Sequence, residues 1–249
     1  MFCRILGCGV LSIFVCLSQS LAGQSINNSE TDTQSPSITH PRPEDGHISV
    51  VRLRAPRKAM ELYNRGWDAL RKQKLDEAEK DIEQVLKIYP IYPDALALRG
   101  AIHLELHQSE AAEQDFRASV DADPTFASAY IGLAEALNEE QRFDDALAVV
   151  EQASQLTPDA WNLQYESSRA LIGKGLYDRA LKVIEEALRA RPARDSLLRL
   201  AKAHALAGLG KLPEAAEELR AYLSSGPTES GDEQARNLLT QLQTAIGGQ

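Results

Sequence analysis

Residues 75–90 read LDEAEKDIEQVLKIYP, and three positions in this stretch recur along the chain. Ala78 is followed four residues later by Ile82 and twelve residues later by Pro90. An alanine, a large apolar residue and a proline return in this order four more times. The prolines are Pro90, Pro124, Pro158, Pro192 and Pro227, at intervals of 34, 34, 34 and 35 residues. A fixed period of this length predicts a repeat architecture.

Each repeat contains two segments in which apolar residues follow a helical period, such as residues 59–72 and 75–88. Polar or glycine-bearing turns separate the two segments. Proline ends the second helix because it lacks an N–H and clashes with the preceding turn, which costs about 3 kcal/mol. The sequence therefore predicts five helix pairs, at about 59–92, 93–126, 127–160, 161–194 and 195–229. A capping helix is expected at about 231–246, giving eleven helices.

Pro90 and Pro93 have the P-x-x-P spacing of a polyproline ligand. Their register within the period instead favours a joint between two repeats. Pro93 is tolerated in the first turn of the next helix, where the N–H groups lack partners. Tyr92 is then expected to pack in the joint.

These positions, together with Leu62, Gly66 and Ala69, resemble the tetratricopeptide repeat over residues 59–227. The resemblance implies an all-α, right-handed α-solenoid whose first helices line a concave groove for a protein partner. Repeat four departs most from the pattern, with Gln164, Ser167 and Ser168. The 35-residue interval places one extra residue in repeat five, which we assign to the segment AGLGK, residues 207–211.

Carried onto this sequence, the resemblance predicts a groove that is apolar and aromatic first, acidic in the middle and basic later. Its residues are Met60, Tyr63, Trp67, Leu70, Ala97, Ala101, Leu104, Ile131, Glu135, Asn138, Tyr165, Arg169 and Arg199. The clamp with which heat-shock co-chaperones of this family hold a carboxylate is absent, because its positions here hold Tyr63, Trp67, Leu98, Ser128 and Gly132. Alternatively, Met60, Tyr63 and Trp67 pack against the N-terminal segment ISVVRL, residues 48–53.

The N-terminus predicts export. Arg4 precedes an apolar run from Ile5 to Leu17, and Ser20 to Ala22 form a small-residue cleavage signal, so residues 1–22 are interpreted as a signal peptide. An uncleaved anchor and a lipid on Cys8 are the alternatives. All three cysteines lie in this segment, so the mature chain would have none. Residues 23–56 have the composition of a disordered linker. Its basic end, HISVVRLRAPRK, either enters the first helix or docks on an acidic surface.

No constellation of residues indicates catalysis, a cofactor or a metal. The net charge of -9 disfavours nucleic-acid binding. His103 and His107 are four residues apart but lack the order of a zinc motif, and a structural role is expected for them. The sequence therefore predicts an exported, periplasmic or secreted, non-enzymatic scaffold for a protein or peptide partner. The alternatives are a self-associating structural module and an accessory factor in envelope, pilus or cell-wall assembly.

Overall fold

The computed structural model describes residues 50–158, 160–190, 196–224 and 229–247. The predicted signal peptide and residues 23–49 of the predicted linker lie outside the described residues. Inside that linker interval, Val50–Leu53 form the short helix α2, so the first described helix precedes the first predicted repeat. The apolar run of the N-terminus, from Ile5 to Leu17, lies outside the described residues. Within the described residues, no helix combines the length and apolar character needed to cross a bilayer.

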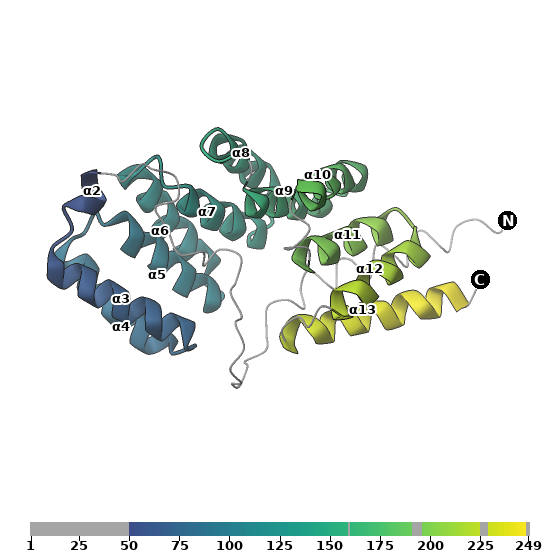
Figure 1. Cartoon of the computed structure of the whole chain (residues 1–249), viewed down its shortest axis with the longest axis horizontal. Helices are drawn as coiled ribbons and strands as arrows, with labels where there is room; N and C mark the ends of the chain where they lie inside the picture. Colours follow the sequence, from purple (N-terminus) through teal and green to yellow (C-terminus); the bar gives the residue numbers. More distant parts are fainter. Residues whose placement is uncertain (1–49, 159, 191–195, 225–228, 248–249) are drawn as a thin grey trace.

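The described elements are all helices, which confirms the predicted all-α solenoid. Five pairs are followed by a terminal helix (Figure 1). The first helices of the pairs are α3 (Arg57–Arg71), α5 (Pro93–Glu105), α7 (Ala127–Glu139), α9 (Trp161–Gly173) and α11 (Ser196–Gly208). The second helices are α4 (Leu75–Ile88), α6 (Ser109–Ala122), α8 (Phe143–Ser154), α10 (Tyr177–Ala190) and α12 (Leu212–Ser224). The terminal helix α13 spans Glu229–Gly247.

One residue in the turn of every pair has a left-handed backbone. Its φ is 56° at Gln73, 57° at His107, 61° at Gln141, 72° at Gly175 and 74° at Gly210. The next residue donates its N–H to the carbonyl five residues back, as Arg142 does to Leu137 (2.9 Å). This is the Schellman arrangement that ends an α-helix and satisfies a terminal carbonyl. The turn geometry is therefore the same in all five pairs, although only the last two use glycine.

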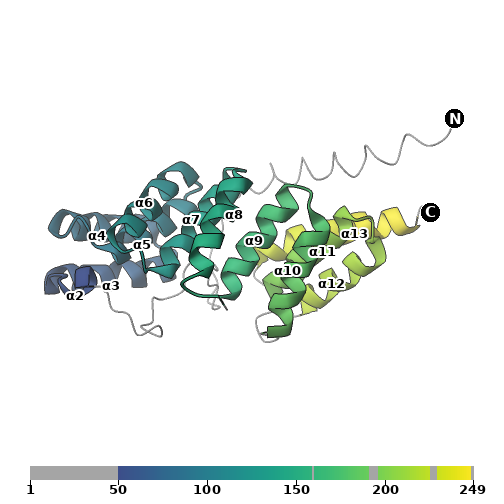
Figure 2. The ribbon, with the colours of Figure 1, turned by 90° about the horizontal axis from the view of Figure 1, so that it is seen from above.

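Close helix packing depends on small residues. The Phe116 ring of α6 lies between Gly100 of α5 and Gly132 of α7, and a Cβ added at Gly100 would stand 3.0 Å from the ring. A Cβ added at Gly132 would overlap the same ring. Each pair thus locks onto the next as the pairs follow one another along the long axis (Figure 2). Tyr92 is buried in the joint before α5, with its ring 5.6 Å from that of Tyr63, as expected.

The position three residues after the repeat's alanine carries an acid in three repeats, which is buried at Asp81 and Asp115 and half-buried at Glu218. Asp81 pairs with Arg65, Asp115 with Arg99, and Glu218 with Lys202. In each case the basic residue lies sixteen residues earlier, on the first helix of the same pair. The third repeat has Leu133 and Val149 at these two positions, both buried. The repeat therefore accepts either an ion pair or an apolar pair at one point of its helix seam.

The apolar core consists of two clusters that meet at α9. One extends from Ala59 to Ala170 and the other from Leu171 to Leu242. Leu147 packs at the edge of both clusters. Between them α9 carries buried polar groups, among them Glu166 and Ser168. The solenoid is thus continuous as a chain of helices, while its apolar core is divided at the fourth repeat.

The assignment of the extra residue to the segment at 207–211 is wrong. First and second helices begin sixteen residues apart in pairs two to five, including α11 and α12. The starts of α9 and α11 are 35 residues apart, whereas the starts of α5, α7 and α9 are 34 apart. Buried Leu163 and Leu171 of α9 correspond to buried Leu198 and Leu206 of α11, which are again 35 residues later. The extra residue therefore precedes Leu198.

Candidate binding surface

The first helices form the inner side of the arch. α5 packs on α7, α7 on α9 and α9 on α11, and these contacts are more extensive than any between successive second helices. In a curved array, elements on the shorter radius approach each other most closely, which places the first helices inside (Figure 1). We call the surface that they form the inner face.

At the N-terminal end, most of the predicted groove residues are part of the core. Met60 is exposed (47%), whereas Tyr63 and Trp67 are buried and Leu70 is only 1% exposed. Tyr63 contacts Tyr92, whose ring lies 5.9 Å from that of Tyr89. The hydroxyl of Tyr89 in turn donates to the backbone oxygen of Val51 in α2 (3.0 Å). The aromatic cluster thus joins the first repeat to the residues that precede it.

The second and third repeats provide an apolar floor. Ala101, Leu104 and Ile131 are buried, and Ala97 is half-buried. Ala97 and Ile131 occupy the same position of successive repeats, 34 residues apart. Small and aliphatic side chains at this position bring α5 and α7 close together. A partner on the inner face could contact this floor at Ala97 more readily than at its buried neighbours.

A buried polar network joins α7 to α9. The side-chain nitrogen of Asn138 donates to the Glu166 carboxylate (2.9 Å) and to the Glu166 backbone oxygen (3.0 Å). Arg169 donates to the same carboxylate (3.0 Å), and its guanidinium lies 5.8 Å from the centre of the Tyr165 ring. Glu135 lies on α7 one turn before Asn138 and is also buried. The structure therefore brings together four predicted residues, and Glu166 is the member that the sequence analysis missed.

Burial perturbs the ionisation of this network. It raises the pKa of Tyr165 to about 12, and it raises the pKa of Glu166 against the opposing effects of Arg169 and Asn138. Burial alone would lower the pKa of Arg169, but the charge of Glu166 raises it above its ordinary value. The guanidinium therefore stays charged and holds Glu166 at the junction of the two core clusters.

Arg199 does not occupy the predicted groove position. Because the extra residue precedes Leu198, the α11 counterparts of Tyr165 and Arg169 are Leu200 and His204. Arg199 lies one position earlier and donates to Glu218 of α12 (3.0 Å). Burial lowers the pKa of His204 to about 4, so this imidazole is neutral at physiological pH. The predicted basic end of the groove is therefore Arg169 followed by a neutral histidine.

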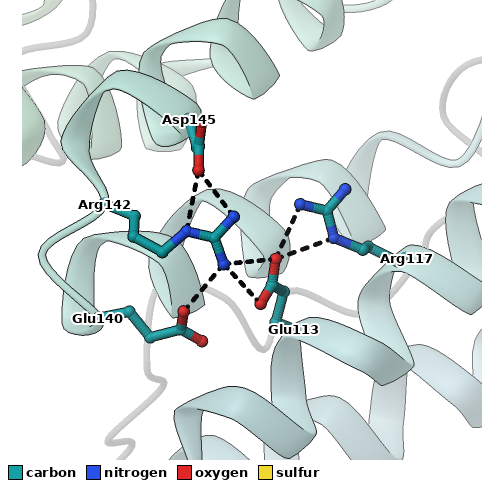
Figure 3. Close-up of polar contacts among 5 residues, drawn as sticks. All are labelled: Glu113, Arg117, Glu140, Arg142 and Asp145. Atoms are coloured by element: carbon teal, nitrogen blue, oxygen red, sulfur yellow. Dashed lines mark hydrogen bonds and ion pairs between the residues drawn. The ribbon is translucent and has the colours of Figure 1, made fainter.

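An ion-pair cluster braces the second repeat against the third at the turn edge (Figure 3). Arg142, in the turn before α8, donates to Glu113 of α6 (2.8 Å) and to Glu140 (3.1 Å), and its Nε donates to Asp145 (2.9 Å). Arg117 shares Glu113 (2.8 Å). Hydrogen bonds to Asp145 and Glu140 raise the pKa of Arg142. At the next joint Lys174 pairs with Asp144, so the braces help to fix the angle between neighbouring pairs.

His103 and His107 both occupy positions where they contribute to the structure of the second repeat. His103 Nδ1 lies 3.0 Å from Asp115 Oδ2, and Arg99 donates to the same carboxylate (2.9 Å). Burial alone would raise the pKa of Asp115, but His103 and Arg99 bring it below its ordinary value. His107 occupies a left-handed turn position. Over the ranges that the structure describes, no group of three His, Cys, Asp or Glu residues is arranged to hold a metal ion.

Comparisons with known proteins agree with this geometry. A tetratricopeptide repeat model matches residues 63–125 and 165–230, and a second one matches residues 103–172. An N-terminal acetyltransferase A complex subunit-like protein of Schizosaccharomyces pombe is 28% identical over 116 residues. That match covers 47% of this chain and 17% of the relative.

Two solved structures share the fold at low sequence identity. A thermophilic tetratricopeptide repeat protein of Thermus thermophilus is 21% identical, with a TM-score of 0.63, and the match covers 76% of this chain and 98% of that one. PilF of Pseudomonas aeruginosa is 16% identical, with a TM-score of 0.60, and the match covers 76% and 90%. The periodic turns, the helix pairs and the family models lead to one conclusion: the chain belongs to the tetratricopeptide repeat family.

Proposed function

We propose that this protein is an exported scaffold that binds a peptide or helical segment of another protein on its inner face, without catalysis. The observation that carries the proposal is the network of Asn138, Glu166, Arg169 and Tyr165. It places polar and aromatic groups beside the packed apolar floor of the second and third repeats. Tyr165 and Arg169 are partly exposed, with 29% of the Arg169 side chain accessible. Family membership supports protein binding in general.

Site-specific photo-crosslinking in the producing cell tests the inner face. A photoreactive amino acid replaces Ala97 or Tyr165, and Glu185, an exposed residue of the second helix α10, serves as the control position. We expect the two inner-face positions to form the same covalent adduct, identified by mass spectrometry, and position 185 to form none. Adducts formed only from position 185 would refute binding on the inner face.

Export is the second part of the proposal, and residues 1–22 support it. We expect the exported product to begin at or near Gly23, which mass spectrometry of the intact protein measures. An intact Met1 on a membrane-bound product would contradict cleavage. Cleavage after Ala22 also removes all three cysteines, so the product should not react with a thiol-specific reagent even when unfolded.

Self-association is the second candidate function, because large apolar residues are exposed at the N-terminal end. Val50 and Leu53 of α2, and Ile91 in the turn before α5, all have most of their side chains accessible. Burial of such residues between copies would be favourable. Sedimentation over a wide range of concentration distinguishes the two functions. A monomer throughout would exclude the oligomeric module and leave the scaffold.

A further inference from the structure

Four carboxylates form one electrostatic cluster on three successive first helices. They are Glu105 at the end of α5, Glu135 and Glu139 on α7, and Glu166 on α9. The charge of Glu139 acts on both Glu105 and Glu166, while that of Glu135 acts on Tyr165 and Arg169. We call this surface the acidic face. It lies toward the C-terminal ends of α5 and α7, at repeats two to four.

Carboxylates outnumber the basic groups that act on this face. Arg169 is bound to Glu166 at the base of the cluster, and His107 lies near Glu105. The hydroxyl of Ser109 donates to Glu139 (3.0 Å) without contributing charge. Burial raises the pKa of Glu105, and the charge of Glu139 raises it further. An added cation would therefore lower the electrostatic energy of the face.

Asn138 provides an independent indication of the same chemistry. Its side chain is directed at the Glu166 carboxylate, to which its nitrogen donates, and the residue is only 6% exposed. The side-chain oxygen is buried and accepts no hydrogen bond from any described residue. A buried acceptor without a donor costs about 1–3 kcal/mol. N–H donors and positive charge are therefore the chemistry that this part of the surface lacks, whereas an anion or an apolar group would complement neither the oxygen nor the carboxylates.

We propose that the acidic face receives a lysine or arginine side chain of the bound partner, so that the partner segment is basic. This inference rests on the proposed binding at the inner face and specifies the chemistry of the partner. Glu139 is exposed and Glu105 is half-buried, so the cation can reach these two carboxylates from solvent. Glu166 is fully buried and already holds Arg169. The incoming cation therefore lies above the network and does not replace Arg169.

Fluorescence anisotropy of the full chain with two labelled twelve-residue peptides tests the proposal. One peptide alternates lysine with alanine, and the other alternates glutamate with alanine. The test variant is Glu105→Gln with Glu139→Gln. Its control, Glu185→Gln with Glu186→Gln, removes the same charge from the exposed side of α10. Measurements at about 150 mM salt suppress long-range attraction to the negatively charged chain as a whole.

We expect the lysine peptide to bind and the glutamate peptide not to bind. The Glu105→Gln, Glu139→Gln variant should weaken lysine-peptide binding about tenfold or more, and the control less than about twofold. Equal weakening by both variants would overturn the proposal, because binding would then follow net charge alone. Equal binding of the two peptides would overturn it as well. Glutamine can still accept the hydrogen bond from Ser109, so the test variant should keep its fold, which circular dichroism checks.

The failure of this inference can be distinguished from failure of the proposed function. If inner-face crosslinking identifies a partner but the Glu105→Gln, Glu139→Gln variant still captures it fully, the basic-partner inference is wrong and the scaffold function remains. If the adduct is a second copy of this chain, whose residues 52–58 are rich in arginine and lysine, the separate-partner proposal is overturned.

Discussion

The first three helix pairs and the last two differ at equivalent positions of the repeat. The left-handed turn residue is Gln73, His107 or Gln141 in the first three pairs and Gly175 or Gly210 in the last two. The first helix ends with Arg71, Glu105 or Glu139 in the first three and with Gly173 or Gly208 in the last two. The apolar core is divided close to this border, within α9, the first helix of the fourth pair.

This difference shows that the repeat conserves the backbone geometry of its turns, while the side chains at equivalent positions differ between the first three pairs and the last two. The turns have the same geometry on both sides of the border, because the same backbone hydrogen bond, to the carbonyl five residues back, closes each of them. What changes is the chemistry at the end of the first helix. Charged residues end α3, α5 and α7, whereas glycines end α9 and α11, where the rings of Phe143 and Tyr177 approach the backbone.

The largest effect is expected from matched core truncations on either side of the border. Ile82 and Ile184 occupy the same position of the repeat, and both are fully buried. Ile82→Ala and Ile184→Ala should each lower the free energy of unfolding by about 2–5 kcal/mol. Hydrogen exchange should rise mainly in α3–α8 for Ile82→Ala and mainly in α10–α13 for Ile184→Ala. If hydrogen exchange rose throughout the chain in both variants, the core would be one cooperative unit and the two regions would not be energetically separate.

A smaller effect is expected from adding one methyl group at glycine. In Gly132→Ala the new Cβ overlaps Phe116, which is buried between two helices and cannot move aside. We expect a loss of about 1–3 kcal/mol in thermal or denaturant unfolding. Gly173→Ala overlaps Phe143, whose side chain is only half-buried and can shift outward. The loss there should be smaller, and equal losses would mean that the two halves are packed equally tightly.

A comparable effect is expected when the polar network at the border is broken. Asn138 replaces the leucines found at Leu70 and Leu104, so Asn138→Leu restores the apolar residue of that position. The change should nevertheless cost about 1–3 kcal/mol, because the buried Glu166 carboxylate loses a donor. Adding Glu166→Gln should recover part of this loss. A stabilised single variant would show that the network contributes nothing to folding.

The smallest effect is expected in the turns. A left-handed backbone costs a non-glycine residue roughly 1–2 kcal/mol, which the greater entropy of unfolded glycine partly offsets. Gln141→Gly should therefore stabilise the chain by about 1 kcal/mol or less, and Gly175→Gln should destabilise it by a similar amount. Denaturant midpoints of the two variants measure this. Shifts of the same sign would show that the turns of the two regions are not equivalent.

The periodic spacing was enough to predict the helix pairs and the family. Prolines and alanines act locally, through backbone hydrogen bonding and close packing, and their effects can be inferred from one chain. The place of the extra residue could not be inferred in this way. The interval between Pro192 and Ala215 is the same wherever the insertion lies, and the glycines of residues 207–211 resembled a lengthened turn. Only the burial pattern of α11 shows that the helix is shifted as a whole.

The candidate surface was predicted less well, because exposure depends on how neighbouring pairs pack. The resemblance assigns Leu70 to the groove, but here its side chain lies in the core. The network at α9 could be suspected from the sequence at Asn138, because this polar residue occupies the repeat position that Leu70 and Leu104 occupy in the first two repeats. Glu166 had no such signal, because its contribution depends on the approach of α7 to α9.

The divided core has a consequence for the mechanics of the molecule. Tension applied to the two ends of an array is carried through each interface between pairs in series. Interfaces filled with interdigitated aliphatic side chains resist separation over their whole area, whereas water can replace the hydrogen bonds of a polar interface one at a time. The section at α9, where the two apolar clusters meet and buried polar groups lie between them, is therefore where we expect a stretched molecule to part first, leaving two folded segments joined by an extended connection.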